Sequence, residues 1–334
     1  MNQKTLKIAL VGFNEAWLET FLDLLKTHNN PVGQLALVTA YPTTDDPIYR
    51  FNNQALMPQP ISNFDFSQVD VAIFTEAELA QNYLDQALQS CQVLDQTGTA
   101  LNSYPETPLY VPNLSQPTGG KVWALADGLV LPLLMTLLPL EQHVGLASIN
   151  VMTCQSVSDN GQSGLYELAQ QSAALLAGKP FESEQFNRQM AFNVLPDIDG
   201  FDEQGSSHSE RLMTNYLQKA LERDDISMLV TSARVPVFYS HAMAIHVTTQ
   251  QPVSVKSCID YLQSIPGITI KNQAEDYPTQ VSDGSGQDNV VVGRLRQPQQ
   301  SDHQLAYWIV ADNLRQGIGL NIINALQYIK QNNE

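Results

Sequence analysis

Arg234 and His241 have side chains of types that could act on an anionic ligand. Both lie in the segment RVPVFYSH, which spans residues 234–241. A guanidinium holds a carboxylate through two parallel N–H···O bonds, and an imidazole gives or takes a proton near neutral pH. The pair therefore predicts a site for a small carboxylate ligand. His241 is either an acid/base group in it or a hydrogen-bonded structural histidine.

The chain has three cysteines, Cys91, Cys154 and Cys258, which are too few and too scattered for a disulfide framework or a metal cluster. This usage is typical of a reducing compartment. Cys154 precedes Gln155 in a stretch that is expected to be a strand, and neighbouring residues of a strand point to opposite faces. We therefore expect Cys154 to be a buried apolar residue that faces away from Gln155.

The composition indicates a folded protein with an acidic surface. Hydrophobic residues make up 43% and charged residues 15% of the 334 residues, and the formal net charge is −17. Such a charge repels nucleic acid and anionic lipid, so neither is an expected partner. The N-terminus is too short and polar for a signal peptide, and the most apolar run, residues 129–140, is too short to span a bilayer. We predict a cytoplasmic protein without a membrane-spanning helix, and a buried helix at residues 129–140.

The first part of the chain alternates between two hydrophobic patterns. Strands are predicted at residues 7–13, 35–39, 69–74 and 93–94, and helices at residues 17–25 and 77–90. Strands that alternate with helices form a parallel sheet with right-handed crossovers. This region is therefore predicted to be α/β and doubly wound.

From about residue 145 the pattern changes, because several strands follow with few helices between them. Strands are predicted at residues 145–157, 226–232, 244–249, 268–270, 290–294 and 306–311, and helices at residues 161–176, 208–222, 254–264 and 318–329. This order predicts a mixed α+β second domain.

Four segments together resemble the aspartate-semialdehyde dehydrogenase family. They are NVLPDI at residues 193–198, RVPVFYSH at 234–241, VGRLR at 292–296 and WIVADNLRQG at 308–317. The family's corresponding motifs are NVIPxI, RVPVxxGH, VGRxR and WxVxDNLRKGA, in the same order. The chain thus resembles a divergent, Usg-type homologue of that family along nearly its whole length.

The resemblance implies a fold and a partner. The expected fold is a Rossmann-type, NAD(P)-binding-like domain over residues 1–126, which the C-terminal helix at residues 318–334 rejoins. A mixed-sheet dimerisation and substrate domain is expected over residues 127–317. Members of the family form homodimers through this second domain, so a homodimer is the expected state.

The resemblance also implies a reaction, the reduction of an acyl phosphate to a semialdehyde with NADP. In the family a cysteine forms a thioacyl-enzyme, a histidine acts as acid and base, and two arginines hold the carboxylate and the phosphate. By this resemblance His241 and Gln155 belong to the catalytic site and Arg234 holds the substrate carboxylate. Gly12 and Asn321 are the positions that would contact the cofactor.

At the nucleophile position the chain departs from the family. The family's ANPNCST segment aligns with ALADGLV at residues 124–130, which places Gly128 where the cysteine stands. Glycine cannot form a thioester, and losing the nucleophile of a catalytic unit removes about 10⁶-fold of turnover. Gln155 is kept in QSVSDNG at residues 155–161, beside the family's QxVSGAG. His241 and Gln155 are therefore predicted to be remnants of a catalytic site.

The cofactor positions differ as well. The family's GxxGxxG loop aligns with GFNEAWL at residues 12–18, where only Gly12 is kept and Glu15 adds a carboxylate. The family's 2′-phosphate loop and SAGG turn align with AYPTTDD at residues 40–46 and TEAE at 75–78. Like charges oppose phosphate binding, so NAD(P) binding is predicted to be weak or lost. Glu15 can also be read as an acidic first helical turn that favours the helix dipole.

The anion clamp is incomplete too. No arginine lies between Arg50 and Arg188, so the family's phosphate-binding arginine has no counterpart, and its ExxK pair falls on Ser209 and Leu212. A side chain one position along a helix points about 100° away, so neighbouring charged residues do not replace the pair.

Three functions are compatible with these residues. The favoured hypothesis is a catalytically inactive homologue that acts as a dimeric binding or regulatory protein. The second is a binding protein in which Arg234 and His241 hold a small dicarboxylate or an amino acid. The third is an oxidoreductase with weak or altered NAD(P)-dependent activity on a carboxylate-bearing aldehyde, for which the sequence nominates no new nucleophile.

Overall fold

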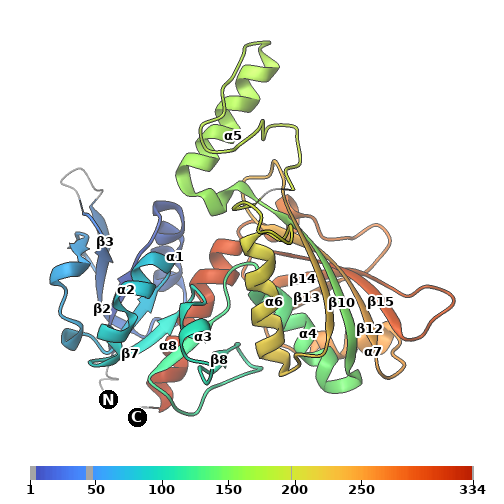
Figure 1. Ribbon diagram of the computed structural model, residues 1–334, viewed down its shortest axis with the longest axis horizontal. Helices are drawn as coiled ribbons and strands as arrows, with labels where there is room; N and C mark the ends of the chain where they lie inside the picture. The colour runs from blue at the N-terminus through green and yellow to red at the C-terminus, as the bar shows by residue number, and fades with distance from the viewer. Residues whose placement is uncertain (1–4, 43–47, 197, 333–334) are drawn as a thin grey trace. The chain divides into compact units, whose positions relative to one another are not determined.

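The computed structural model describes residues 5–42, 48–196 and 198–332. The chain divides into two compact units (Figure 1). Unit 1 comprises Met1–Asp127 and Ile318–Glu334, and unit 2 comprises Gly128–Gly317. The division falls one residue after the boundary that was expected between residues 126 and 127.

Unit 1 is built around a seven-stranded sheet with the order β5-β2-β1-β6-β7-β9-β8. All of its strand pairs are parallel. The strands are β1 (Leu6–Val11), β2 (Val32–Thr39), β5 (Gln59–Pro60), β6 (Val71–Phe74), β7 (Gln92–Asp95), β8 (Leu109–Tyr110) and β9 (Val122–Leu125). The chain goes from β1 to β2 on one side and crosses back to β6 on the other, which is the Rossmann-type strand order.

Unit 1 also contains three longer helices, which are α1 (Glu15–Thr27), α2 (Ala77–Leu88) and α8 (Asn321–Asn332). Its remaining elements are short. They are helix α3 (Thr99–Ser103), the antiparallel pair β3 (Tyr49–Phe51) and β4 (Gln54–Leu56), and the 3-10 turns η1 (Ile61–Asn63) and η2 (Phe66–Gln68). Helix α8 packs inside this unit, where the ring of Tyr328 lies 6.0 Å from that of Tyr110 and 5.8 Å from that of Trp123. Unit 1 therefore needs both ends of the chain.

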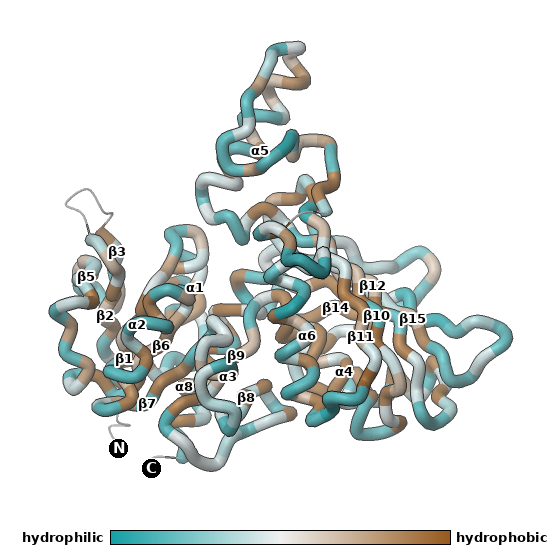
Figure 2. The backbone as a smooth tube through the Cα atoms, viewed as in Figure 1, coloured by the Kyte–Doolittle hydropathy of each residue, from teal (hydrophilic) through white to brown (hydrophobic). Residues whose placement is uncertain are grey.

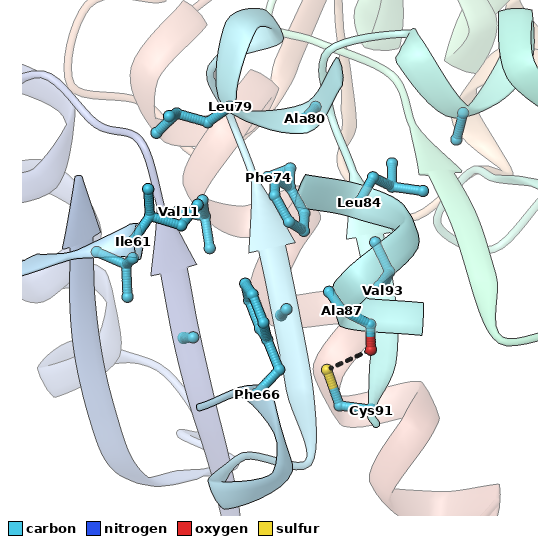
Figure 3. Packing of buried hydrophobic residues seen from close by; sticks show 14 residues of the cluster. Val11, Ile61, Phe66, Phe74, Leu79, Ala80, Leu84, Ala87, Cys91 and Val93 are labelled. Carbon is cyan, nitrogen blue, oxygen red and sulfur yellow. Dashed lines mark hydrogen bonds between the residues drawn. The ribbon is translucent and has the colours of Figure 1, made fainter. Parts of the chain in front are cut away.

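One hydrophobic cluster joins the central strands of unit 1 to α2 (Figure 3). Val11 of β1 and Phe74 of β6 are fully buried beside Leu84 of α2. Strands that are covered on both faces are apolar throughout, which explains the run LKIALV of β1. Cys91 belongs to this cluster and donates a weak hydrogen bond to the carbonyl of Ala87. The cluster fixes the point at which β1 ends and the Gly12 turn begins.

Unit 2 contains a six-stranded mixed sheet with the order β11-β10-β12-β15-β14-β13. Its strands are β10 (Leu146–Gln155), β11 (Ser227–Arg234), β12 (His241–Thr249), β13 (Ile268–Lys271), β14 (Val290–Arg296) and β15 (Gln304–Ala311). Two pairs are parallel, β10 with β11 and β13 with β14, and the other three are antiparallel. The two sheets together confirm the predicted fold class, α/β plus α+β.

Helices cover one face of this sheet. They are α4 (Val130–Val144), α6 (His208–Leu221) and α7 (Val255–Gln263), which contact one another and the strands. Helix α4 contains the apolar run that was predicted to be a buried helix, and it is buried along most of its length. Figure 2 shows the hydropathy of this helix along the backbone. Among the described residues, no helix is long and apolar enough to cross a membrane.

The opposite face of the sheet is covered at one end and open further along. The π-helical turn η4 (Gln280–Gly284) covers the end at which β12 begins, and Gln280 donates to the carbonyl oxygens of Cys154 and Ser240. Beyond it, Met152 of β10 and Leu229 of β11 are 46% and 66% exposed. A sheet face with exposed apolar side chains is a common place for a protein partner.

A helical arm projects from unit 2 (Figure 1). It consists of the 3-10 turn η3 (Val157–Asn160), helix α5 (Gly161–Leu176) and the segment that returns toward α6. Glu167 and Gln171 of α5 are buried and accept hydrogen bonds from backbone N–H groups of the returning segment. These bonds hold the returning segment against α5.

The end of the second domain differs from the expected single helix. A π-helix, η5 (Asn313–Leu320), precedes the α-helical part, which begins at Asn321. Gly317 lies in η5, and its backbone is packed so closely against Gly128 that an added Cβ would lie 2.0 Å from the Gly128 Cα. Wide π-type turns are frequent at functional sites.

Candidate functional site

Gln155, Arg234 and His241 lie at one edge of the unit 2 sheet. Gln155 ends β10 and pairs in register with Arg234, which ends the parallel strand β11. His241 begins β12, which runs antiparallel to β10, so it lies at the same edge. The three residues are 2%, 6% and 1% exposed, respectively. The structure thus brings together the three site residues that the sequence predicted in this domain.

The His241 imidazole has partners on both ring nitrogens. Nδ1 lies 3.1 Å from the Ser156 backbone N–H, which donates to it, and 3.3 Å from the Ser156 hydroxyl. Nε2 lies 3.2 Å from Oδ2 of Asp159. A neutral imidazole that accepts at Nδ1 carries its proton at Nε2, so His241 donates to Asp159.

Asp159 is the centre of this network, and the sequence analysis did not identify it. Its Oδ2 lies 3.4 Å from Nη1 of Arg234, and its Oδ1 accepts from Nδ2 of Asn313 at 2.9 Å. Desolvation opposes ionisation of this carboxyl. The interactions with His241 and Arg234 and the hydrogen bond from Asn313 outweigh it, and they lower the pKa of Asp159 to about 2. Asp159 is therefore a carboxylate at any physiological pH.

Asn313 locks the loop that carries Asp159. Its Oδ1 accepts from the backbone N–H of Ser240 at 3.1 Å, and its Nδ2 also donates to the Ser158 hydroxyl at 3.0 Å. Arg234 holds the same loop from the other side, because Nη1 donates to the carbonyl of Ser156 at 2.7 Å. The carboxylate of Asp159 is thus fixed between Arg234 and His241, the two side chains that were predicted to hold a ligand.

A sequence signal for Asp159 did exist. In QSVSDNG it stands at the position of the first glycine of the family's QxVSGAG, where a side chain is absent. A carboxylate that replaces a glycine directly after Ser158 could have been flagged as an internal ligand. Gln155 itself donates to Ser209 at 3.1 Å and Thr153 at 3.2 Å, so its amide is held within the unit.

Gly128 is buried, and no side chain fits there. A Cβ built on it would lie 2.5 Å from the carbonyl oxygen of Asn313 and 3.1 Å from the Asn313 Cβ. Real Cβ atoms essentially never come within 3.0 Å of another heavy atom, so the backbone would have to move. The carbonyl of Asn313 fills the space in which a side chain at position 128 would begin.

No cysteine forms a hydrogen bond with the His241 ring among the described residues. Among the described residues, the hydrogen-bond partners of the His241 ring are Ser156 and Asp159 alone. Cys154 faces away from Gln155, as predicted, and packs beside Ala242 and Val310, but it is half-buried and not fully buried as expected. Desolvation raises the pKa of its thiol. A thiol with a raised pKa is a poor nucleophile.

Ser156, His241 and Asp159 resemble the order of groups in a hydrolytic triad, but the serine is closed off. Ser156 is 0% exposed, and its hydroxyl lies 2.9 Å from that of Ser158, which is also 0% exposed. A nucleophile must reach within about 3–3.5 Å of a reacting carbon. The arrangement can hold a proton on His241, but it offers no atom that attacks a substrate.

The turn after β1 in unit 1 does not fit a dinucleotide phosphate. Gly12 adopts a positive φ of 77°, and a Cβ built on it would lie 2.3 Å from the Cβ of Glu76 and 3.0 Å from its Oε2. Burial and the neighbouring Glu78 raise the pKa of Glu76. A carboxylate therefore stands beside the backbone that a phosphate would need to approach, and like charges oppose such binding.

The start of α1 supports the same conclusion. Asn14 caps the helix by accepting from the Trp17 N–H at 3.0 Å, and Glu15 forms the acidic first turn that the sequence allowed. Leu18, at the third glycine position of the family loop, is 0% exposed and part of the core. Its side chain takes the space that a glycine leaves for close packing of the helix. Residues 43–46 of the expected 2′-phosphate loop lie outside the described residues.

Asn321, the other expected cofactor contact, is fully buried at the start of α8. Its Nδ2 donates to the carbonyl of Ala126 at 2.8 Å, and its Oδ1 has no partner among the described residues. One acceptor is thus available, but the Gly12 turn offers no place for the phosphates. The residues present do not fit NAD(P) as a whole.

Comparison with known proteins gives a consistent result. The family described as "Semialdehyde dehydrogenase, dimerisation domain" matches residues 137–316. Aspartate-semialdehyde dehydrogenase 2 of Vibrio cholerae is 35% identical over 329 residues, which are 96% of this chain and 97% of that protein. A USG-1 protein homolog of Pseudomonas aeruginosa is 31% identical over 324 residues, 95% of this chain and 96% of its own.

The fold agrees with a solved structure of a relative. The crystal structure of aspartate semialdehyde dehydrogenase II from Vibrio cholerae, complexed with ASA, has a TM-score of 0.89 and 34% sequence identity, and the match covers 98% of this chain and 99% of that one. The motifs, the two sheets and these matches lead to one conclusion: the chain belongs to the aspartate-semialdehyde dehydrogenase family.

Proposed function

We propose that this chain is a catalytically silent member of its family that acts as a binding or regulatory protein. The observation that carries the proposal is the packing at Gly128, the position of the family's cysteine. The carbonyl of Asn313 would lie 2.5 Å from any Cβ there. Position 128 thus lacks the thiol, and the backbone of Asn313 also fills the place that a thiol would need. A thioacyl intermediate has neither a sulfur nor room for one.

The network around Asp159 supports the same proposal. An acid/base histidine must exchange protons with a substrate, and a carboxylate-binding arginine needs free N–H groups. Here Asp159 lies 3.2 Å from the His241 Nε2 and 3.4 Å from the Arg234 Nη1. In the native chain the Asp159 carboxylate repels a free carboxylate ligand that would bind between His241 and Arg234. We therefore rank a small-carboxylate binder at this site, and an oxidoreductase of altered chemistry, below a silent homologue.

An activity assay tests the proposal directly. We expect the full chain to produce no NADPH above the blank with aspartate semialdehyde, phosphate and NADP⁺, a loss of about 10⁶-fold relative to a complete catalytic unit. The enzyme of Vibrio cholerae named above is the positive control under the same conditions. Turnover within about tenfold of that control would refute the proposal.

We also propose that the chain forms a homodimer through the open face of the unit 2 sheet. The family that matches this region is named for dimerisation. Met152 and Leu229 expose apolar side chains on that face, and an apolar sheet face is stabilised when a second copy covers it.

The oligomeric state tests this second proposal. We expect sedimentation at micromolar concentration to give the mass of a dimer, and Leu229→Asp to shift the species toward the monomer, because a charge at the centre of an interface is costly to desolvate. The matched control is Leu176→Asp, an exposed leucine on α5 away from that face. A monomeric parent chain would show that the open face is not a dimer interface.

A further inference from the structure

A second cavity lies in unit 2, apart from the Asp159 network. It has a volume of about 470 Å³ and opens where the segment returning from α5 meets the end of β11. Backbone hydrogen bonds between Leu195 and Arg234, at 2.9 and 2.7 Å, fix one wall. Of the residues that bind Asp159, only Arg234 borders it. The volume is in the usual range for pockets that take small molecules.

The floor of this cavity is apolar and buried. Phe186, Leu195 and Ile198 line it and are 8%, 7% and 3% exposed. Apolar side chains that border a cavity can cover an aliphatic or aromatic group of a ligand, which is stabilised because its apolar surface is removed from water. The floor thus favours a ligand with an apolar part.

The rim carries two opposite charges. Arg188 and Asp199 line the cavity and are both exposed. Neither forms an ion pair with another of the described residues. A ligand with a single charge would be attracted by one of them and repelled by the other, whereas a zwitterion satisfies both.

A buried acceptor lies at the same cavity. Oδ1 of Asn160 is shielded from solvent and has no hydrogen-bond partner among the residues that the structure describes. Asn160 precedes α5, but its side chain makes no capping hydrogen bond. A buried acceptor without a donor is destabilising, so a donor that reached it from the cavity would be stabilised there. An ammonium group has three N–H donors.

We propose that this cavity binds a free amino acid with an apolar side chain. Arg188 pairs with the carboxylate, Asp199 and Oδ1 of Asn160 accept from the ammonium group, and the side chain lies on the floor of Phe186, Leu195 and Ile198. This site is distinct from the one at His241. It does not depend on the loss of catalysis, because none of its three polar contacts belongs to the Asp159 network.

Calorimetry with three probes tests the assignment of each charge. We expect the full chain to bind L-leucine saturably. Isocaproate lacks the ammonium group and isoamylamine lacks the carboxylate, so each should bind at least about tenfold more weakly than L-leucine. Asp199→Asn should weaken L-leucine about tenfold and leave isocaproate unchanged. Asparagine tolerates the positive φ of Asp199, 62°, so this variant should keep its fold.

Arg188→Gln gives the complementary result. It should weaken L-leucine and isocaproate alike and leave isoamylamine unchanged, whereas the control Arg296→Gln, at an exposed arginine that does not line this cavity, should change nothing. The absence of heat with L-leucine, L-methionine and L-phenylalanine up to about 10 mM would overturn the proposal. So would binding that both rim variants leave intact.

Discussion

Replacing Gly128 with cysteine is expected to destabilise the chain and to leave it without NADP-dependent turnover. In a protein that had merely lost its thiol, the same change would restore the nucleophile. Here the new Cβ would lie 2.5 Å from the Asn313 carbonyl oxygen, and Gly317 packs against Gly128 from the same stretch of η5. Overpacking of a closed backbone contact costs about 1–3 kcal/mol, occasionally more. We expect a loss of about 2–3 kcal/mol in the free energy of unfolding.

Urea unfolding and the NADPH assay measure the two effects on the same preparation. The matched control is Gly119→Cys, because a Cβ at Gly119 meets nothing within 4 Å and its φ is not positive. This control should have the stability of the parent chain. If Gly128→Cys were as stable as the parent and gained turnover, the filled position would not be the barrier to catalysis, and our proposed function would be wrong.

Replacing Asp159 with asparagine is expected to give the second large effect, a loss of stability that depends on pH. The change removes the carboxylate that His241 and Arg234 share. A charged hydrogen bond contributes about 1.5–3 kcal/mol when it is buried. Because 33% of the Asp159 side chain is exposed, solvent screens the interaction, and we expect about 1–2 kcal/mol above pH 4.

The direction with pH follows from the lowered pKa. Asp159 titrates at about 2 in the folded chain against an ordinary value of 3.8, so its contribution is complete above about pH 4 and is lost as the pH falls toward 2. The difference between the parent and Asp159→Asn should therefore disappear in that interval. Asp260→Asn is the control, since its exposed i,i+4 pair with Lys256 should contribute only about 0.3–0.5 kcal/mol.

A free carboxylate should partly replace the one that is removed. In Asp159→Gly the residue of the family motif returns and opens space beside Arg234 and His241. Ligands that bind only the folded state raise its stability. We therefore expect acetate to raise the melting temperature of this variant more than that of the parent at equal ionic strength. If acetate acted equally on both, Asp159 would not be an internal ligand.

Most of the fold followed from the sequence because its signals are local. The apolar run of β1, the helical spacing of α1 and α2 and the change of pattern near residue 145 fixed two sheets of different kinds. The π-helical turn before α8 was not predicted. It depends on the close approach of Gly317 to Gly128, a contact between residues far apart in the chain.

The candidate site was predicted in part for the same reason. Gln155, Arg234 and His241 end or begin neighbouring strands, so the strand pattern and the family motifs placed them together. The role of Asp159 depends on how the loop after β10 bends back toward the His241 imidazole. A hydrophobic pattern in the sequence does not predict the path of such a loop. Glu76 was aligned with the family's SAGG turn, but only the structure places its side chain against Gly12.

The make-up of unit 1 affects how the chain is completed during synthesis. Helix α8, whose Tyr328 ring lies beside the rings of Tyr110 and Trp123, follows unit 2 in the chain. Every residue of unit 2 is therefore made before it, and domains generally fold as units as they emerge. Unit 1 is thus completed only after unit 2 has been made. A nascent chain that stops short of α8 would expose the aromatic surface of unit 1 to chaperones and proteases.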